Sequence, residues 1–225
     1  MSTRSKRYRA IAQKVEPNKQ YSLDDAIALI QATATTKFDS GVELHMKLGI
    51  DPKKGEEQVR GTIVLPHGTG KIVRIAAFTK NPEAAKKAGA DIVGSEDLIK
   101  EIQTTKKADF DIAIAEPEMM KLMAPIAKIL GSQGLMPSPK NETVTSDVAK
   151  AVEAFKKGKL AFKNDDTGNI HILVGKVSYT TAQLKENIET FMDSIKRSRP
   201  QATKGVFIQS ITISSSMGPG VRVTI

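Results

Sequence analysis

Short apolar runs alternate with capped helical segments in the middle of the chain, from residue 71 to about residue 158. This alternation is typical of parallel β-α units, in which a helix follows each strand. Asparagine, serine and proline mark the helix starts, and glycine marks the ends. The pattern predicts strands at residues 71–78, 90–94 and 109–116, and helices at residues 81–89, from Ser95 onward, at 117–131 and at 146–158.

One of these helices is expected to run without a break from Pro117 to Gly131. Its apolar residues recur at helical spacing, so they should face inward together. They are Leu122, Ile126, Ile129 and Leu130.

The two flanks of this block follow another pattern. A capping box of Ser22 and Asp25 predicts a helix over residues 22–35. Residues 41–50 then alternate, which predicts a half-solvated strand with Val42, Leu44, Met46 and Leu48 inward and Glu43, His45 and Lys47 outward. The other predicted elements are strands at residues 59–65, 159–164, 169–175, 205–213 and 221–225, and a long helix with Leu184, Ile188, Phe191 and Ile195 on one stripe.

These patterns predict an α+β two-domain protein. An antiparallel α+β domain is expected from both termini, residues 1–67 plus 159–225, with a three-layer α/β domain inserted at residues 68–158. The chain would cross between the domains near residues 66–70 and 158–160, and two crossings imply a hinge.

Charge narrows the class of partner. The chain has a formal net charge of +9, which attracts polyanions such as nucleic acid. Residues 67–159 carry 15 basic and 12 acidic side chains and the flanks carry 19 and 13, so the flanks are the better candidate for an RNA-binding face. The basic N-terminal segment, with Arg4, Lys6, Arg7 and Arg9, is either a solvated tail or an arm that contacts phosphate.

Several other classes of protein are disfavoured. Without cysteine there is no disulfide, thiol nucleophile or thiolate metal site, and a cytosolic setting fits best. No stretch reaches the roughly 20 apolar residues that span a bilayer, and no signal peptide is expected. His45, His67 and His171 lack metal-ligand spacing, so neither a metal nor a cofactor is expected.

Enzyme motifs are also missing. The segment from Leu65 to Ile72 has glycines and a lysine, but a phosphate-binding P-loop needs glycine at Leu65 and serine or threonine at Ile72. We interpret it as a linking loop whose glycines permit positive φ. The three serines at 214–216 have no sequence context that marks a catalytic base, so no catalytic residue is predicted. Two alternatives stay open at this point, a nucleotide-using enzyme and a non-specific basic nucleic-acid binder.

Three long segments resemble one known family. They run KFDSGVELHMKLGIDPKKGEEQVRGTIVLPHGTGK from Lys37, GKLAFKNDDTGNIHILVGK from Gly158 and KGVFIQSITISSSMGPGVRV from Lys204. The chain is similar over nearly its whole length to the bacterial form of large-subunit ribosomal protein one, the family of the mobile ribosomal stalk. The resemblance implies a terminal RNA-binding α+β domain with a Rossmann-like insert. It also implies direct binding to stalk ribosomal RNA, a part in release of exit-site tRNA, and translational repression through the messenger of its own operon.

The resemblance also implies an RNA-contact patch. Only 4% of the residues are aromatic, so recognition should depend on RNA shape, backbone and hydroxyl groups instead of extensive base stacking. Lysine can meet phosphate, Phe38 and Met217 can pack on sugar or base faces, serines can bond ribose hydroxyls, and Gly218 should let a foreign backbone come close. The expected RNA-binding residues are Lys37, Phe38, Ser210, Ser214, Ser216, Met217 and Gly218, with Lys163, His171 and Lys176 in matching segments.

Overall fold

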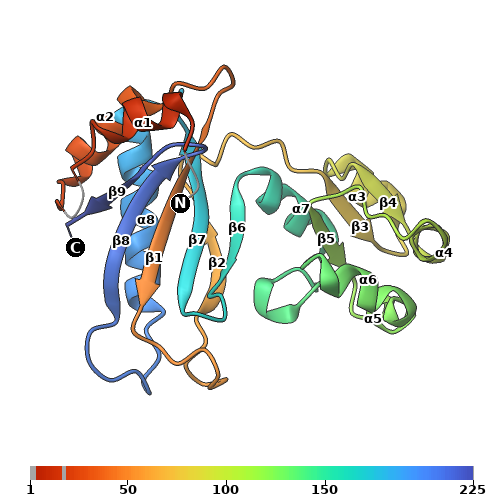
Figure 1. The fold of residues 1–225 in the computed structure, drawn as a ribbon. Coiled ribbons are helices and arrows are strands. Elements are labelled where there is room, and N and C mark those ends of the chain that lie inside the picture. The colour runs from red at the N-terminus through yellow and green to blue at the C-terminus, as the bar shows by residue number, and fades with distance from the viewer. Residues whose placement is uncertain (1–3, 17–18, 225) are drawn as a thin grey trace. The chain divides into compact units, whose positions relative to one another are not determined.

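The computed structural model describes residues 4–16 and 19–224. Within them the chain divides into two compact units (Figure 1). The terminal unit takes in the described residues up to Gly70 and from Ala161 onward, and the inserted unit comprises Lys71–Leu160. The mixed α and β character that the sequence predicts is confirmed, and each unit is described by itself below.

The terminal unit is built on a sheet whose described strands run in the order β7-β1-β8-β9, here called the antiparallel sheet. Strand β1 (Gly41–Leu48) pairs with β7 (Asn169–Lys176) on one side and β8 (Ile208–Ser215) on the other. Strand β9 (Gly220–Val223) pairs with β8, and all three pairings are antiparallel. Because β1 lies between β7 and β8, segments far apart in the sequence form one surface.

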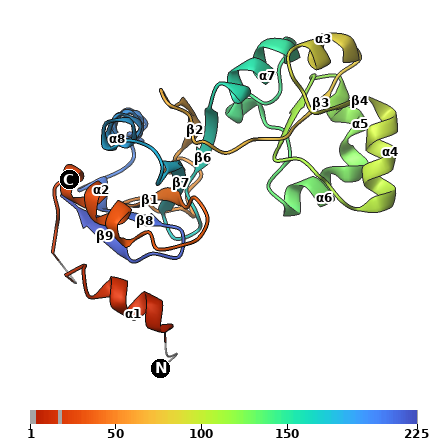
Figure 2. The same ribbon diagram turned by 90° about the horizontal axis from the view of Figure 1, so that it is seen from above.

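One face of the antiparallel sheet holds the core of the terminal unit. The inward positions predicted for β1 are buried, so the alternation over residues 41–48 is confirmed. Helices α2 (Leu23–Thr33) and α8 (Thr181–Arg197) contact each other and cover this face, α2 against β8 and β9, and α8 against β7 (Figure 2). The other face is therefore left free of these two helices.

Side chains at the helix starts explain where the two covering helices begin. Ser22 caps α2, since its Oγ accepts a hydrogen bond of 3.2 Å from the Asp25 amide. Helix α8 begins with a full capping box of Thr180 and Gln183. Each cap satisfies amide groups that have no partner within the helix.

Three shorter elements complete the terminal unit. Residues in the basic N-terminal segment form helix α1 (Lys6–Ala12), where no helix was expected. Strands β2 (Arg60–Val64) and β6 (Lys159–Lys163) pair in a sheet of their own, and the boundary between the units falls within β6. The turn from β6 to β7 is ordered by the Asp165 carboxylate, which accepts hydrogen bonds from Thr167 and Asn169.

The inserted unit is built on a parallel sheet, whose described strands run in the order β4-β3-β5. Apolar residues of α3 and α7 pack on one face of this sheet, and those of α4 and of residues 119–130 pack on the other, which gives three layers. Its strands and principal helices are β3 (Ile75–Phe78), α3 (Pro82–Lys87), β4 (Ile92–Gly94), α4 (Glu96–Thr105), β5 (Ile112–Ala115) and α7 (Val148–Lys156).

The prediction of one unbroken helix from Pro117 to Gly131 is wrong. Pro125 lacks an amide hydrogen and its ring collides with the carbonyl of the preceding turn, so the helix is interrupted. Leu122, expected to face inward, is instead 41% exposed. The segment forms α5 (Met119–Leu122), a 3₁₀ turn η1 (Ala124–Ile126) and α6 (Ala127–Ser132), and a second 3₁₀ turn, η2 (Pro139–Asn141), follows.

Other boundaries differ by a few residues from the expected ones. The strand expected from residue 71 begins at Ile75, and the one expected from residue 205 begins at Ile208. Asp147, and not Ser146, caps α7. Of the strand expected at residues 221–225, residue 225 lies outside the described residues, as do residues 1–3 of the basic segment.

Candidate nucleic-acid interface

The uncovered face of the antiparallel sheet carries polar and basic side chains. Strand alternation turns Glu43, His45 and Lys47 of β1 to this face, and paired residues of neighbouring strands share it. His45 lies opposite His171 of β7 and Thr212 of β8. We call this surface the open face and define it by Glu43, His45, Lys47, His171, Ser210, Thr212, Ser214 and Arg222.

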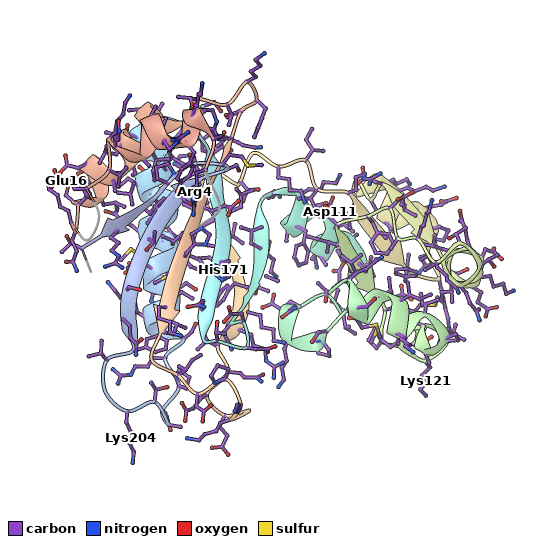
Figure 3. All side chains as sticks on the ribbon, in the orientation of Figure 1. Arg4, Glu16, Asp111, Lys121, His171 and Lys204 are labelled. Carbon is purple, nitrogen blue, oxygen red and sulfur yellow. The ribbon has the colours of Figure 1, made fainter. Side chains whose placement is uncertain are left out.

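Two histidines lie at the centre of the open face, where Figure 3 labels His171. The Nδ1 atoms of His45 and His171 are 2.8 Å apart, within hydrogen-bond distance. His45 Nε2 is also 3.0 Å from Ser214 Oγ. Burial lowers the pKa of His45, and the neighbouring His171 lowers it further, while Glu43 opposes the shift.

A second group of expected residues gathers at one end of the antiparallel sheet. There β1 begins and β7 and β8 end, because Gly41 pairs with Lys176 and Val42 pairs with Ser215. The segment before β1 and the turn after β8 therefore lie at the same end. We call this group the end cluster, and it consists of Lys37, Phe38, Lys176, Ser216, Met217 and Gly218.

The end cluster combines exposed apolar side chains with cations. Phe38 is 56% exposed and Met217 is 69% exposed, although both are large apolar residues. Lys37, which precedes Phe38 in the chain, is exposed, and Lys176 Nζ lies 3.4 Å from the carbonyl oxygen of Asp39. Exposed apolar groups beside lysines fit a partner that offers both flat sugar or base faces and phosphates.

The turn that carries Met217 is held by its own hydrogen bonds. The Gly218 amide donates to Ser215 O at 2.9 Å, and the Ser216 amide donates to Gly41 O at 3.0 Å. Met217 has a φ of +61°, which a residue with a side chain adopts only where its surroundings enforce it. The structure thus fixes the position from which the methionine side chain projects.

Gly218 has a reason within the protein to be glycine. A Cβ at this position would lie 2.2 Å from the buried Ser215 Oγ, which is closer than any real contact. From the sequence, either an ordinary hairpin turn or close approach of a foreign backbone could account for this glycine. The turn itself already requires the glycine.

Arg7 connects helix α1 to the end cluster. One guanidinium nitrogen donates to Thr35 Oγ1 at 3.1 Å and the other donates to the Met217 carbonyl at 3.0 Å. The basic segment around Arg7 is therefore placed next to the predicted contact residues. The run of cations without an acidic residue was the available sequence signal, but it did not reveal the helix or its contact.

The expected RNA-binding residues do not all lie together. Ser210 is on the open face beside Lys47, at the far end from the end cluster. Ser214 and His171 also lie on the open face, whereas Lys163 lies on β6, outside the antiparallel sheet. The predicted contact set lacked five residues that lie on the open face or beside the end cluster: His45, Lys47, Thr212, Arg222 and Arg7. For His45 and Lys47 the sequence signal was their outward position in the alternation of residues 41–50.

The loop at residues 65–70 is fixed to helix α8 and is not arranged as a phosphate cradle. Asn187, fully buried, accepts from the His67 amide at 3.1 Å and donates to Gly68 O at 3.0 Å and to Val174 O at 2.8 Å. Gly68 and Gly70 have φ values of +63° and +67°, which confirms the expectation for these glycines. The loop continues into β3, so it does not lead into a helix whose N-terminus could hold an anion, as a P-loop does.

The described part of the chain contains neither a candidate metal site nor a candidate membrane span. Among residues 4–16 and 19–224, no group of three or more histidine, aspartate or glutamate side chains could hold a metal ion. Within the same residues, every helix is too short or too polar to cross a bilayer.

Comparison with known proteins identifies the family. A model of the Ribosomal protein L1p/L10e family matches residues 30–219, which include the end cluster and most of the open face. The chain belongs to this family. As a member of the ribosomal L1p/L10e family it is a structural protein and not an enzyme, as the sequence predicted.

Several curated relatives in the ribosomal L1p/L10e family match the chain from end to end. Large ribosomal subunit protein uL1 of Mesoplasma florum is 50% identical, with 100% of both chains covered. The protein of the same name from Thermosipho melanesiensis is 49% identical over 99% of this chain and 97% of its own. That of Neisseria meningitidis is 46% identical over the same shares.

Proposed function

We propose that this chain is a structural component of the large ribosomal subunit in the cytoplasm and binds a helical stalk of ribosomal RNA directly. The terminal unit would make the contact through the end cluster and the open face. The observation that carries this proposal is that two exposed apolar side chains, Phe38 and Met217, lie at the same end of the antiparallel sheet as the lysines of the end cluster, with Met217 on a turn fixed by hydrogen bonds. The names of the relatives, each a large ribosomal subunit protein, support the same conclusion.

Each part of the surface has a role in this proposal. Lysines of the end cluster meet phosphates, Phe38 and Met217 pack on sugar or base faces, and Ser210, Ser214 and Ser216 bond ribose hydroxyls. The ribose hydroxyl distinguishes RNA from DNA, so the serines supply selectivity and the lysines supply affinity. Lys163, away from the sheet, would contribute only through its charge.

The proposal extends to the organisation of the chain and to two further partners. The terminal and inserted units would be separate domains, with the insert contacting a neighbouring RNA segment and turning about the two crossings. The protein would take part in release of deacylated exit-site tRNA. It would also repress its own operon by binding a messenger structure similar to the stalk.

The central test replaces Met217 with aspartate. Met217→Asp places a charge where RNA sugar or base should pack, and we expect affinity for a stalk-type ribosomal RNA hairpin to fall by about tenfold to a hundredfold, roughly 1–3 kcal/mol. Binding is measured beside an unrelated RNA duplex, at low and at physiological salt.

Val206→Asp is the matched control, because Val206 is 71% exposed and lies in the terminal unit outside the end cluster. It changes the net charge equally, so it reports the non-specific electrostatic loss alone. Equal losses in the two variants would contradict the site. Equal affinity of the unchanged protein for both RNAs would leave only a non-specific basic binder.

The messenger partner is tested by competition. If one surface serves both RNAs, the leader of the operon's messenger displaces the stalk hairpin, and Met217→Asp weakens both complexes together. Simultaneous binding of the two RNAs would contradict a shared site.

A further inference from the structure

The two central histidines of the open face share a single hydrogen bond. Their Nδ1 atoms face each other at 2.8 Å, so one ring must donate a proton and the other must accept it. A neutral pair satisfies this bond, and so does a pair with one added proton. A second added proton would place two N–H groups face to face, and for that reason the pair holds at most one positive charge.

The outer nitrogens of both rings face hydrogen-bonding or acidic partners. His45 Nε2 is 3.0 Å from Ser214 Oγ and 3.8 Å from a Glu43 carboxylate oxygen. His171 Nε2 is 3.6 Å from an Asp165 carboxylate oxygen. The Asp165 carboxylate already accepts hydrogen bonds within its turn, so it is only partly available to the histidine.

Other charged groups on the sheet are cations. Lys47 follows His45 by two positions on β1 and donates to the carbonyl of Thr167, and Arg222 of β9 pairs with Thr212. Helices α2 and α8 lie on the opposite face, so their charges do not face the histidines. The strands and the turn between β6 and β7 thus place two carboxylates and two cations around the pair, with serine and threonine hydroxyls between them.

The rings remain accessible to a ligand. The side chain of His171 is 55% exposed and that of His45 is 30% exposed. Partial burial and the neighbouring ring lower the pKa of His45, so protonation of its ring is disfavoured in the free protein. An anion placed over the rings would oppose both effects and stabilise the imidazolium form.

We propose that His45 and His171 together form a phosphate-binding subsite at the centre of the open face, and that the pair takes up one proton when an RNA phosphate binds. This inference rests on the proposed function, because the phosphate belongs to the bound RNA. The proton comes from solvent and is shared between the rings.

The sign of the pH dependence follows from linkage. Bound phosphate raises the pKa of the pair, so the gain in affinity is complete below the pKa of the free pair and is lost as pH rises through the pKa of the complex. One linked proton changes the affinity by at most about tenfold per pH unit. We expect RNA binding to be roughly five- to tenfold tighter at pH 6 than at pH 8.

The experiment uses the full chain and the stalk hairpin from pH 5.5 to 8 at constant ionic strength. The chain has three histidines, so His67 supplies a matched control. His45→Gln and His171→Gln should each abolish most of the pH dependence, whereas His67→Gln should retain it. Titration of the RNA itself would appear equally in every variant and cancels in the comparison. An unchanged pH dependence in His45→Gln would overturn the proposal.

A second measurement is independent of the stalk RNA. The imidazole signals of His45 and His171 are followed by NMR against pH, in chloride and in inorganic phosphate. We expect phosphate to raise the pKa of His45 and to change the signals of both paired rings, while the signals of His67 do not respond to phosphate. No shift would overturn the subsite. Failure of the hairpin to bind at any pH, with the shift present, would instead count against the proposed RNA function alone.

Discussion

Replacement of the buried Asn187 by alanine should destabilise the terminal unit severely. Its side chain lies on the core stripe of α8, yet it makes three hydrogen bonds to the backbone, one to His67, one to Gly68 and one to Val174. Alanine removes all three. The backbone groups of His67, Gly68 and Val174 would then lose their hydrogen-bond partner, and water could replace it only poorly because the site is buried.

The magnitude follows from these bonds. Each contributes about 1 kcal/mol net, so Asn187→Ala should reduce the free energy of unfolding by about 3 kcal/mol, and more where a group stays buried without a partner. For a chain of this size, that corresponds to a fall in Tm of roughly 6–12 °C. Asn187→Asp should cost more at pH 7, because it places a carboxylate against the carbonyls of Gly68 and Val174.

Urea unfolding followed by far-ultraviolet circular dichroism measures the effect. The control is Glu189→Ala, which introduces the same residue at an exposed position of the same helix. We expect the control to change stability by less than about 0.5 kcal/mol. If Asn187→Ala matched Glu189→Ala, the reasoning that this side chain anchors the loop to α8 would be refuted.

Two further substitutions test local geometry. Gly218→Ala should destabilise the turn by about 1–3 kcal/mol through the close approach to Ser215 Oγ. Adding Ser215→Ala should recover much of that loss in unfolding experiments, and equal stability of the single and double variants would contradict the collision. Although burial alone would raise the pKa of Asp165, its hydrogen bonds from Asn169 and Thr167 together hold that pKa far below its usual range. Its stabilising effect is therefore complete above the unfolded pKa of about 4 and is lost only as pH falls toward the much lower folded pKa. Asp165→Asn should therefore destabilise fully at pH 6 and by a smaller amount at pH 3, and a difference that stayed constant between these two pH values would argue against the carboxylate.

The elements that could be predicted from the sequence are those whose periodicity is set by burial on one side. Strand β1 is a case, because its inward residues are all buried and its outward ones are polar. Helix α1 gives no such signal, since Ile11 is its one buried residue within the described helix and its other residues are mostly charged or exposed. The break between α5 and α6 does have a sequence signal, because Pro125 interrupts a helix whatever the apolar spacing around it.

The candidate site was harder to predict because it depends on strand register. Nothing local shows that His45 and His171, far apart in the sequence, lie opposite each other. The contact between Arg7 and Met217 joins the two ends of the chain and has no local signal either. Asn187 does have a sequence signal, because it is a polar residue next to Ile188 of the apolar stripe. A polar side chain buried at such a position usually forms hydrogen bonds, often with the backbone.

The strand order of the antiparallel sheet has a consequence for synthesis of the protein. Strand β1 lies between two strands that the ribosome makes much later. Its neighbour β8 can leave the exit tunnel only after more than 200 preceding residues have been translated. The residues of the inserted unit are contiguous, so they can collapse while β1 still has no neighbour. A nascent chain that stops before Ser210 has neither β8 nor the turn with Met217, and consequently has no complete surface with which to capture RNA.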